Sequence, residues 1–120
     1  MRISSRQVEA ELPLTAAERA AVRAFSGWLR GHFGERISEL SLFGSRARGE
    51  GHAESDVDLL VAIDDLTSAA RREIACESGE AMTQWAVLLS PFALSTERLA
   101  SLRSRERLIA REIDRDGIAL

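Results

Sequence analysis

The sequence contains no lysine, only one cysteine and no long hydrophobic run. All sixteen basic residues are therefore arginine, so a group of arginines does not by itself mark a phosphate-binding site. The single Cys76 cannot form a disulfide within the chain, which predicts a reducing, cytoplasmic location. No apolar stretch approaches the length that crosses a bilayer, and Glu9 and Glu11 interrupt the segment where a signal peptide would be apolar. We therefore expect neither a membrane partner nor export.

The formal net charge is −3 over 120 residues. Proteins that bind nucleic acid in bulk usually carry an excess of positive charge, so this function is not expected. A chain of this length can bury the core of one domain but leaves little room for a second. We expect a single domain over residues 1–120, in which the polar residues 1–13 form a loosely ordered N-terminal segment.

Apolar periodicity predicts an α/β (α+β) domain with flanking helices and a mixed sheet of about three to four strands. Two strands are predicted at Ile37 to Phe43 and at Val57 to Ile63, and the second, almost wholly apolar, should be central. A third strand is predicted at Trp85 to Leu89. Helices are predicted from Thr15 to about Gly31–Gly34, from about Ala69 to Met82, from Ser95 or Thr96, and over Ser104 to Asp116.

Apolar residues at helical spacing predict which helix faces are buried. Val22, Phe25, Trp28 and Leu29 form one such stripe, and Ile74, Met82 and Trp85 form another. The arginines of the C-terminal helices have two interpretations, a solvated helix face or contact with a partner or an RNA backbone. These residues are Arg98, Arg103, Arg105 and Arg107.

The segment between the first two predicted strands carries two carboxylates. Gly44 and Ser45 are followed by ten residues and then by Asp56-Val57-Asp58. Successive strand side chains point to opposite faces, so Asp56 and Asp58 should share a face, roughly 6.5–7 Å apart. One divalent cation can bridge such a pair, and Mg²⁺ prefers hard oxygen ligands completed by water and phosphate. The pair predicts a magnesium site that also takes a nucleoside triphosphate.

The first half of the same segment predicts the phosphate cradle. Gly44 allows the backbone to approach a ligand closely, and the turn that follows can direct free N–H groups at an anion. Ser45 adds a hydroxyl donor. Arg46 and Arg48 add fixed positive charge and forked donors that suit phosphate oxygens.

A simpler interpretation is a solvated loop that merely enters a strand. The position of Asp58 argues against it, because this residue lies inside an apolar run. An unpaired carboxylate is costly to bury there and needs a cation or strong hydrogen-bond donors. The two halves together therefore predict a site more firmly than either half alone.

Gly44-Ser45, the ten-residue spacing and Asp56-Val57-Asp58 resemble the signature of the minimal nucleotidyltransferases, a branch of the DNA polymerase β superfamily. The resemblance extends through Leu42 to Gly49, Ser55 to Val61 and Glu112 to Ile118. It implies a nucleotidyltransferase fold with Gly44 and Ser45 at the triphosphate of ATP or another nucleotide. It also implies that Asp56 and Asp58 are catalytic and hold Mg²⁺.

The family transfers a nucleoside monophosphate, here expected to be AMP, to a hydroxyl group. Many small members are antitoxins that pair with HEPN-domain toxins, and some adenylylate the toxin. The resemblance therefore implies a HEPN-type toxin or another protein acceptor as the partner.

The sequence departs from the family in one respect. A third carboxylate is usual in the next strand, yet the predicted strand Trp85 to Leu89 contains none. The nearest acids, Asp64, Asp65 and Glu97, do not occupy that place. The loss affects activation of the acceptor more than nucleotide binding, which leaves enzymatic activity open.

Two other functions compete with the transferase. The missing acid favours a catalytically impaired module that binds nucleotide or protein and neutralises or scaffolds its partner by contact. A free-standing transferase for a small hydroxyl compound, such as an antibiotic, fits the motif but lacks a substrate domain, and we rank it last.

Overall fold

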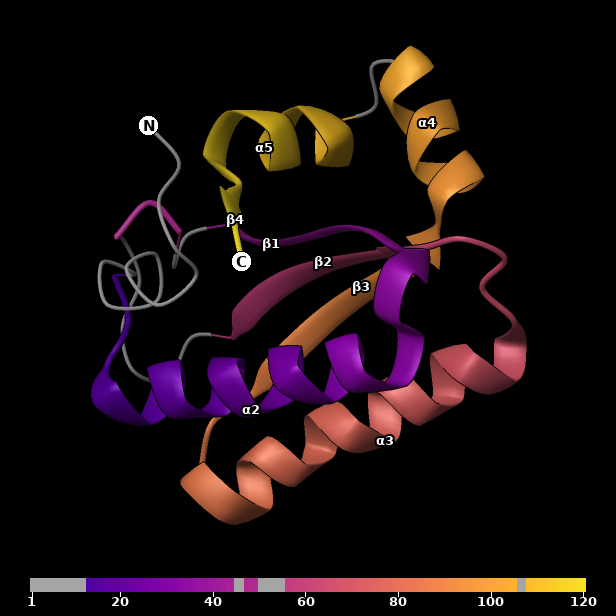
Figure 1. Ribbon diagram of the computed structural model, residues 1–120. Helices are drawn as coiled ribbons and strands as arrows, with labels where there is room; N and C mark the ends of the chain where they lie inside the picture. Colours follow the sequence, from indigo (N-terminus) through magenta and orange to yellow (C-terminus); the bar gives the residue numbers. More distant parts are fainter. Residues whose placement is uncertain (1–12, 45–46, 50–55, 106–107) are drawn as a thin grey trace.

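The computed structural model describes residues 13–44, 47–49, 56–105 and 108–120 (Figure 1). The prediction that residues 1–13 are loosely ordered lies outside these residues, apart from Pro13. Ser45, Arg46 and residues 50–55, between the first two predicted strands, also lie outside them. None of the described helices is long and apolar enough to span a lipid bilayer.

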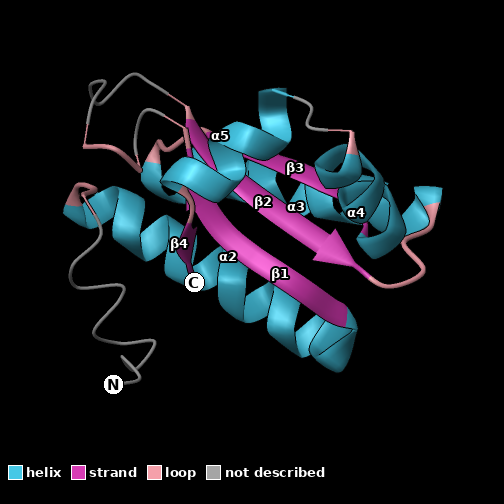
Figure 2. Ribbon diagram, turned by 90° about the horizontal axis from the view of Figure 1, so that it is seen from above, coloured by secondary structure: helices cyan, strands magenta, loops and turns pink. Residues whose placement is uncertain are grey.

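A four-stranded mixed sheet lies at the centre of the fold, in the order β3-β2-β1-β4 (Figure 2). Strand β1 (Ile37–Phe43) pairs antiparallel with β2 (Val57–Ile63) and with β4 (Ile118–Ala119), whereas β2 runs parallel to β3 (Leu89–Ser95). The first two strands have the predicted bounds, and the predicted mixed α+β sheet is confirmed. The two-residue β4 was too short for the sequence to predict.

Helices cover both faces of the sheet (Figure 1). The helices α2 (Ala16–Phe33) and α3 (Ser68–Trp85) pack on one face, and α4 (Thr96–Ser104) and α5 (Leu108–Asp116) pack on the other. Alternate residues of β2 enter the two cores, which explains why almost the whole strand is apolar. The prediction of a buried central strand is confirmed.

The start of α2 follows the predicted capping box. The Glu18 N–H donates to Thr15 Oγ1 at 3.1 Å, and the Thr15 N–H donates to Glu18 Oε1 at 2.8 Å. The stripe predicted on this helix is inward, with Val22, Phe25 and Leu29 buried and Trp28 packed at the edge of the core. Gly34, at φ +55°, ends the helix as expected.

The predicted third strand is wrong in position. Helix α3 continues through Trp85, because Trp85 still packs against the core, and Ala86 then leaves the helix at φ +56°. The strand itself is Leu89–Ser95 and includes Pro91. The Val57 N–H donates to Leu88 O, and the alternation of parallel pairing then turns the nitrogen of Pro91 away from β2. A proline at this outward position of an edge strand removes no ladder hydrogen bond.

Two smaller predictions also need correction. Met82 was expected to face the sheet with Ile74, but its side chain is 46% exposed, because the helix turns this position to solvent. In the described residues, the helix predicted over Ser104 to Asp116 is α5 (Leu108–Asp116), whereas Ser104 is the last residue of α4.

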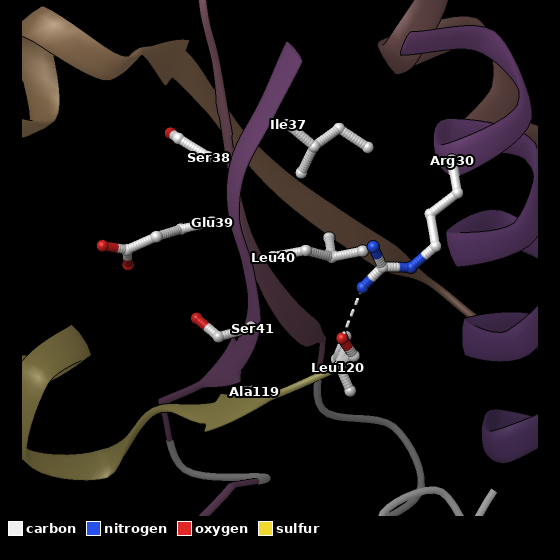
Figure 3. Close-up of a pocket in the computed structure, with 8 residues that line it drawn as sticks. All are labelled: Arg30, Ile37, Ser38, Glu39, Leu40, Ser41, Ala119 and Leu120. Atoms are coloured by element: carbon white, nitrogen blue, oxygen red, sulfur yellow. Dashed lines mark hydrogen bonds between the residues drawn. The ribbon is translucent and has the colours of Figure 1, made fainter. Parts of the chain in front are cut away.

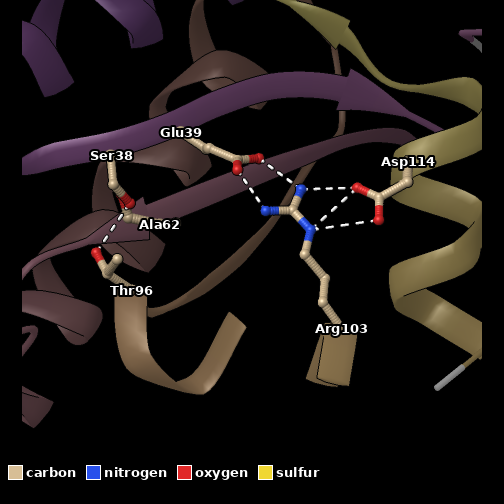
Figure 4. A network of polar contacts seen from close by, with 6 residues as sticks. All are labelled: Ser38, Glu39, Ala62, Thr96, Arg103 and Asp114. Atoms are coloured by element: carbon tan, nitrogen blue, oxygen red, sulfur yellow. Dashed lines mark hydrogen bonds and ion pairs between the residues drawn. The ribbon is translucent and has the colours of Figure 1, made fainter. Parts of the chain in front are cut away.

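The α4–α5 layer is fastened to the sheet by Arg103 (Figure 4). Its guanidinium donates to Glu39 Oε2 of β1 at 2.9 Å and to Asp114 Oδ1 of α5 at 2.7 Å. The planar fork of arginine suits such simultaneous contact with two carboxylates. Arg103 therefore stabilises the fold. It is one of the four arginines for which the sequence left a solvated helix face and contact with a partner as alternatives.

Candidate functional site

The predicted carboxylates lie where β1 ends and β2 begins. Asp56 is exposed and directly precedes β2, whereas Asp58 is half-buried within it. Asp58 lies opposite Phe43 of β1 and beside Ser90 of β3. Because Gly44 follows Phe43, the strand pairing brings the first residue of the predicted cradle to Asp58. This contact spans the two halves of the motif.

Gly44 lies so close to Asp58 that a side chain on it would require the Asp58 carboxylate to move. Its backbone has a φ of +78°, and a Cβ atom placed on it would lie 2.6 Å from Asp58 Oδ2. The N–H groups of Ala47 and Arg48 both donate to Gly44 O, at 3.2 and 3.4 Å, which forms a turn. Glycine is thus required by the backbone conformation and by the carboxylate together.

We expect Gly44→Ala to lower the free energy of unfolding by about 1–3 kcal/mol, because it combines a left-handed backbone with a steric clash. Urea denaturation measures this loss. Gly79→Ala is the matched control, since Gly79 is in the exposed part of α3 with no atom within 4 Å of the added Cβ. That control should gain about 0.5–1 kcal/mol. Equal stability of Gly44→Ala and wild type would disprove the close approach.

The surroundings of Asp58 disfavour its negative charge. Burial raises the pKa of the Asp58 carboxyl above its ordinary value of 3.8, and the nearby charges of Asp56 and of Glu112 on α5 raise it further. A bound cation would relieve each of these costs. Among the described residues, however, no three His, Cys, Asp or Glu side chains are grouped closely enough to hold a metal ion. A cation here would therefore take Asp56 and Asp58 as its protein ligands and complete its shell with phosphate and water.

The raised pKa predicts that Asp58→Asn is more stable than wild type at pH 7 without divalent ions. The folded protein holds the proton on Asp58 more tightly than the unfolded chain does, so wild-type stability falls as pH rises above 3.8 through the folded pKa. The gain in melting temperature should shrink as pH falls toward 3. Each kcal/mol corresponds to roughly 4 °C in a domain of this size.

Glu80→Gln is the control for Asp58→Asn, because Glu80 is an exposed carboxylate on α3. It should leave the melting temperature unchanged at both pH values. A lower melting temperature of Asp58→Asn at pH 7 would contradict the electrostatic account.

The guanidinium of Arg48 is held by the end of α5. Arg48 Nη1 donates to Asp116 Oδ2 at 2.7 Å, and Arg115 Nη2 donates to the same carboxylate oxygen at 2.9 Å. The Asp116 side chain is only 6% exposed. The two arginines lower the pKa of the Asp116 carboxyl to about 2, with Arg115 as the larger cause. Arg48 is therefore tethered to α5, and its contact with a triphosphate stays a prediction.

Asp116→Asn should destabilise the protein at pH 7 and make little difference in strong acid. A lowered carboxyl pKa contributes stability that is present above 3.8 and is lost as pH falls toward about 2. Urea denaturation of both proteins at pH 7, 5 and 3 measures the difference. A deficit of Asp116→Asn that stays constant over this range would show that the ion pairs contribute nothing.

The observed third strand, β3, lies beside Asp58 and, like the predicted strand Trp85 to Leu89, contains no acidic residue. Strand β3 reads Leu-Ser-Pro-Phe-Ala-Leu-Ser, and Ser90 is the residue level with Asp58. Glu112 acts on Asp58 from another element, at a sequence separation that no local pattern reveals. Asp116 was likewise missed as the partner of Arg48. The only signal for both was their place in the family-like segment Glu112 to Ile118.

A hollow of about 330 Å³ lies elsewhere, on the free edge of β1 (Figure 3). It exists because β4 pairs only with Ser41 and Leu42, and Arg30 donates across it to Leu120 O. The carboxylates do not line it, so it is not part of the predicted site.

Comparison with known proteins identifies the class to which the fold and motif belong. The sequence matches the nucleotidyltransferase domain family over residues 27–113, well over half of its length. The chain is therefore a member of the nucleotidyltransferase domain family, and the resemblance stated from the motif is confirmed. No curated protein matches the sequence.

Solved structures share this fold. A structure provisionally described as a minimal nucleotidyltransferase is 24% identical, with a TM-score of 0.59 over 88% of this chain and 97% of that chain. A mutant MntA-HpeT toxin–antitoxin structure is 22% identical, with a TM-score of 0.56 over 82% of this chain and 69% of that chain. A toxin–antitoxin structure with AMP-PNP is 21% identical, with a TM-score of 0.54 and coverages of 80% and 69%.

Proposed function

We propose that the protein binds a nucleoside triphosphate with Mg²⁺ and transfers its nucleoside monophosphate to a hydroxyl group on a protein partner. The observation that carries the proposal is the contact of Gly44 with Asp58. It places the Gly44 backbone, which a phosphate group can approach, next to the Asp58 carboxylate, whose negative charge a cation would stabilise. ATP is the proposed nucleotide, and AMP the proposed transferred group.

Each residue of the motif has a proposed role. Asp56 and Asp58 hold Mg²⁺, while the Gly44 amide, Ser45 and Arg46 contact the triphosphate. Arg48 keeps the loop in place through Asp116 and adds positive charge near the phosphates. Mg²⁺, when bound, neutralises phosphate charge in the transition state.

The reaction balances without an additional reactant. The acceptor oxygen forms a bond to the α-phosphorus, and the bond from that phosphorus to the bridging oxygen of the β-phosphate breaks. Pyrophosphate leaves with the bridging oxygen, and the hydroxyl proton passes to water. No described carboxylate of β3 is available to take that proton.

The proposed partner is a HEPN-type toxin, with both proteins in the cytoplasm. Likeness of fold to structures from toxin–antitoxin complexes supports a toxin as the partner. A single small domain also suits an acceptor that is itself a folded protein.

The test is incubation with Mg²⁺ and each α-labelled nucleoside triphosphate, with and without cell extract. We expect label on one protein acceptor, highest with ATP, and release of pyrophosphate. The double variant Asp56→Asn/Asp58→Asn should lose transfer by at least about 100-fold, because the cation loses both protein ligands. Glu80→Gln should transfer at the wild-type rate. Unchanged transfer in the double variant would refute the assigned site.

A second function, a non-catalytic binding module, is favoured by the absence of an acid from β3. Such a module would protect its partner by contact alone. It would bind nucleotide without transferring label, and protection would persist in Asp56→Asn/Asp58→Asn. The enzyme would lose protection and transfer together in that variant.

A further inference from the structure

A groove of about 320 Å³ runs along β3. Figure 2 shows β3 as the edge strand of the sheet. Its floor is apolar and comes from three elements, with Phe92 and Leu94 on β3, Leu102 on α4 and Ile109 on α5. Arg71 of α3 and Arg98 of α4 complete the lining. The groove thus combines an apolar floor with two positive charges.

Both arginine side chains are exposed, and within the described part of the chain neither guanidinium has an ion pair or hydrogen bond. Arg103, only five residues after Arg98, is by contrast held by two carboxylates. Exposed arginines without partners are common, so the charges alone do not define a site.

The positions of the two arginines add a second consideration. Arg71 is the fourth residue of α3, and Arg98 is the third residue of α4. The N-terminus of a helix carries partial positive charge, so cations there are unfavourable for the isolated chain. Glu97, the acid in the first turn of α4, does not line the groove. The charged side chains among the described lining residues are thus both positive, and an anionic partner would complement them.

The edge of β3 restricts how such a partner can bind. Pro91 faces outward and has no N–H, so a partner strand cannot pair continuously along this edge. Ala93 also lines the groove, although its side chain packs on the α2–α3 side of the sheet. The groove consequently suits an apolar side chain inserted between polar ends better than it suits an added strand.

The groove begins near the candidate site. Phe92 is level with Leu60 of β2, two residues beyond the level of Asp58, which corresponds to about 7 Å along the strand. Phe92 packs in the same core as Leu60, so it lies on the α4–α5 side of the sheet, the side to which the alternation of β2 also turns Asp58. A segment bound in the groove would lie beside the carboxylates, although binding itself does not require transfer.

We propose that this groove docks an acidic, extended segment of a partner protein. One apolar side chain of the segment rests on Phe92, Leu94 and Leu102, and its flanking carboxylates pair with Arg71 and Arg98. A protein segment fits better than RNA, because the floor is apolar and only two arginines of the described residues border it, whereas an RNA backbone needs many cations. The net charge of −3 agrees with a local rather than a general attraction for anions.

The probe is a fluorescein-labelled peptide, three repeats of Glu-Leu-Asp, measured by fluorescence anisotropy and by chemical-shift mapping on ¹⁵N-labelled full chain. We expect shifts centred on Phe92 and Ala93 and an affinity that falls with added salt. Arg71→Ala and Arg98→Ala should each weaken binding by about 2- to 5-fold. The double reversal Arg71→Glu/Arg98→Glu should weaken it by more than about tenfold.

Arg72→Ala is the matched control, because Arg72 is the neighbouring exposed arginine on α3 and does not line the groove. It should bind the peptide as wild type does. Absence of peptide binding, shifts centred elsewhere, or equal binding by Arg71→Glu/Arg98→Glu would overturn the proposal. Tighter binding of a labelled oligouridylate, with the same dependence on both arginines, would overturn it in favour of RNA.

Discussion

Asp58 lies at the start of the most deeply buried strand, where any side chain on Gly44 would collide with its carboxylate. The rest of β2 is apolar because helices cover both faces of the sheet. A strand buried on both faces can hold a carboxylate in one place while it limits the solvation of that carboxylate. A negative charge on Asp58 therefore costs free energy, and a bound cation would lower that cost.

The backbone at Gly44, directly after β1, depends on the same constraint. Antiparallel pairing of Phe43 with Asp58 fixes where the chain leaves β1, and Gly44 must then turn in a left-handed conformation. Asp116 holds the loop from the other side through Arg48. The end of α5 is in turn fastened to β1 through Arg103 and Asp114. Elements distant in sequence thus converge on the first residues of the motif.

The features that the sequence predicted well are local ones. The capping box of α2 and the bounds of β1 and β2 follow from residues within a few positions of one another. The position predicted for the third strand was wrong because the residues from Trp85 to Leu89 are mostly apolar, as the residues of a buried strand are. Only the tertiary packing of Trp85 extends the helix, and only the edge position of β3 admits Pro91.

Charge was the least predictable property. Arg98 and Arg103 are similar in sequence, yet one borders an open groove and the other is bound by two carboxylates. Arg48 was expected to face a phosphate, and its partner Asp116 is 68 residues away. These long-range pairings determine which arginines stabilise the fold. The sequence alone therefore does not show which arginines are held by carboxylates elsewhere in the chain.

The most direct test of the central claim is a crystal structure with Mn²⁺ and a non-hydrolysable ATP analogue, read from the anomalous signal of the metal. The account predicts a metal peak bridging the carboxylates of Asp56 and Asp58, with the triphosphate over the Gly44 turn. A nucleotide bound elsewhere, or a metal that contacts neither aspartate, would contradict it.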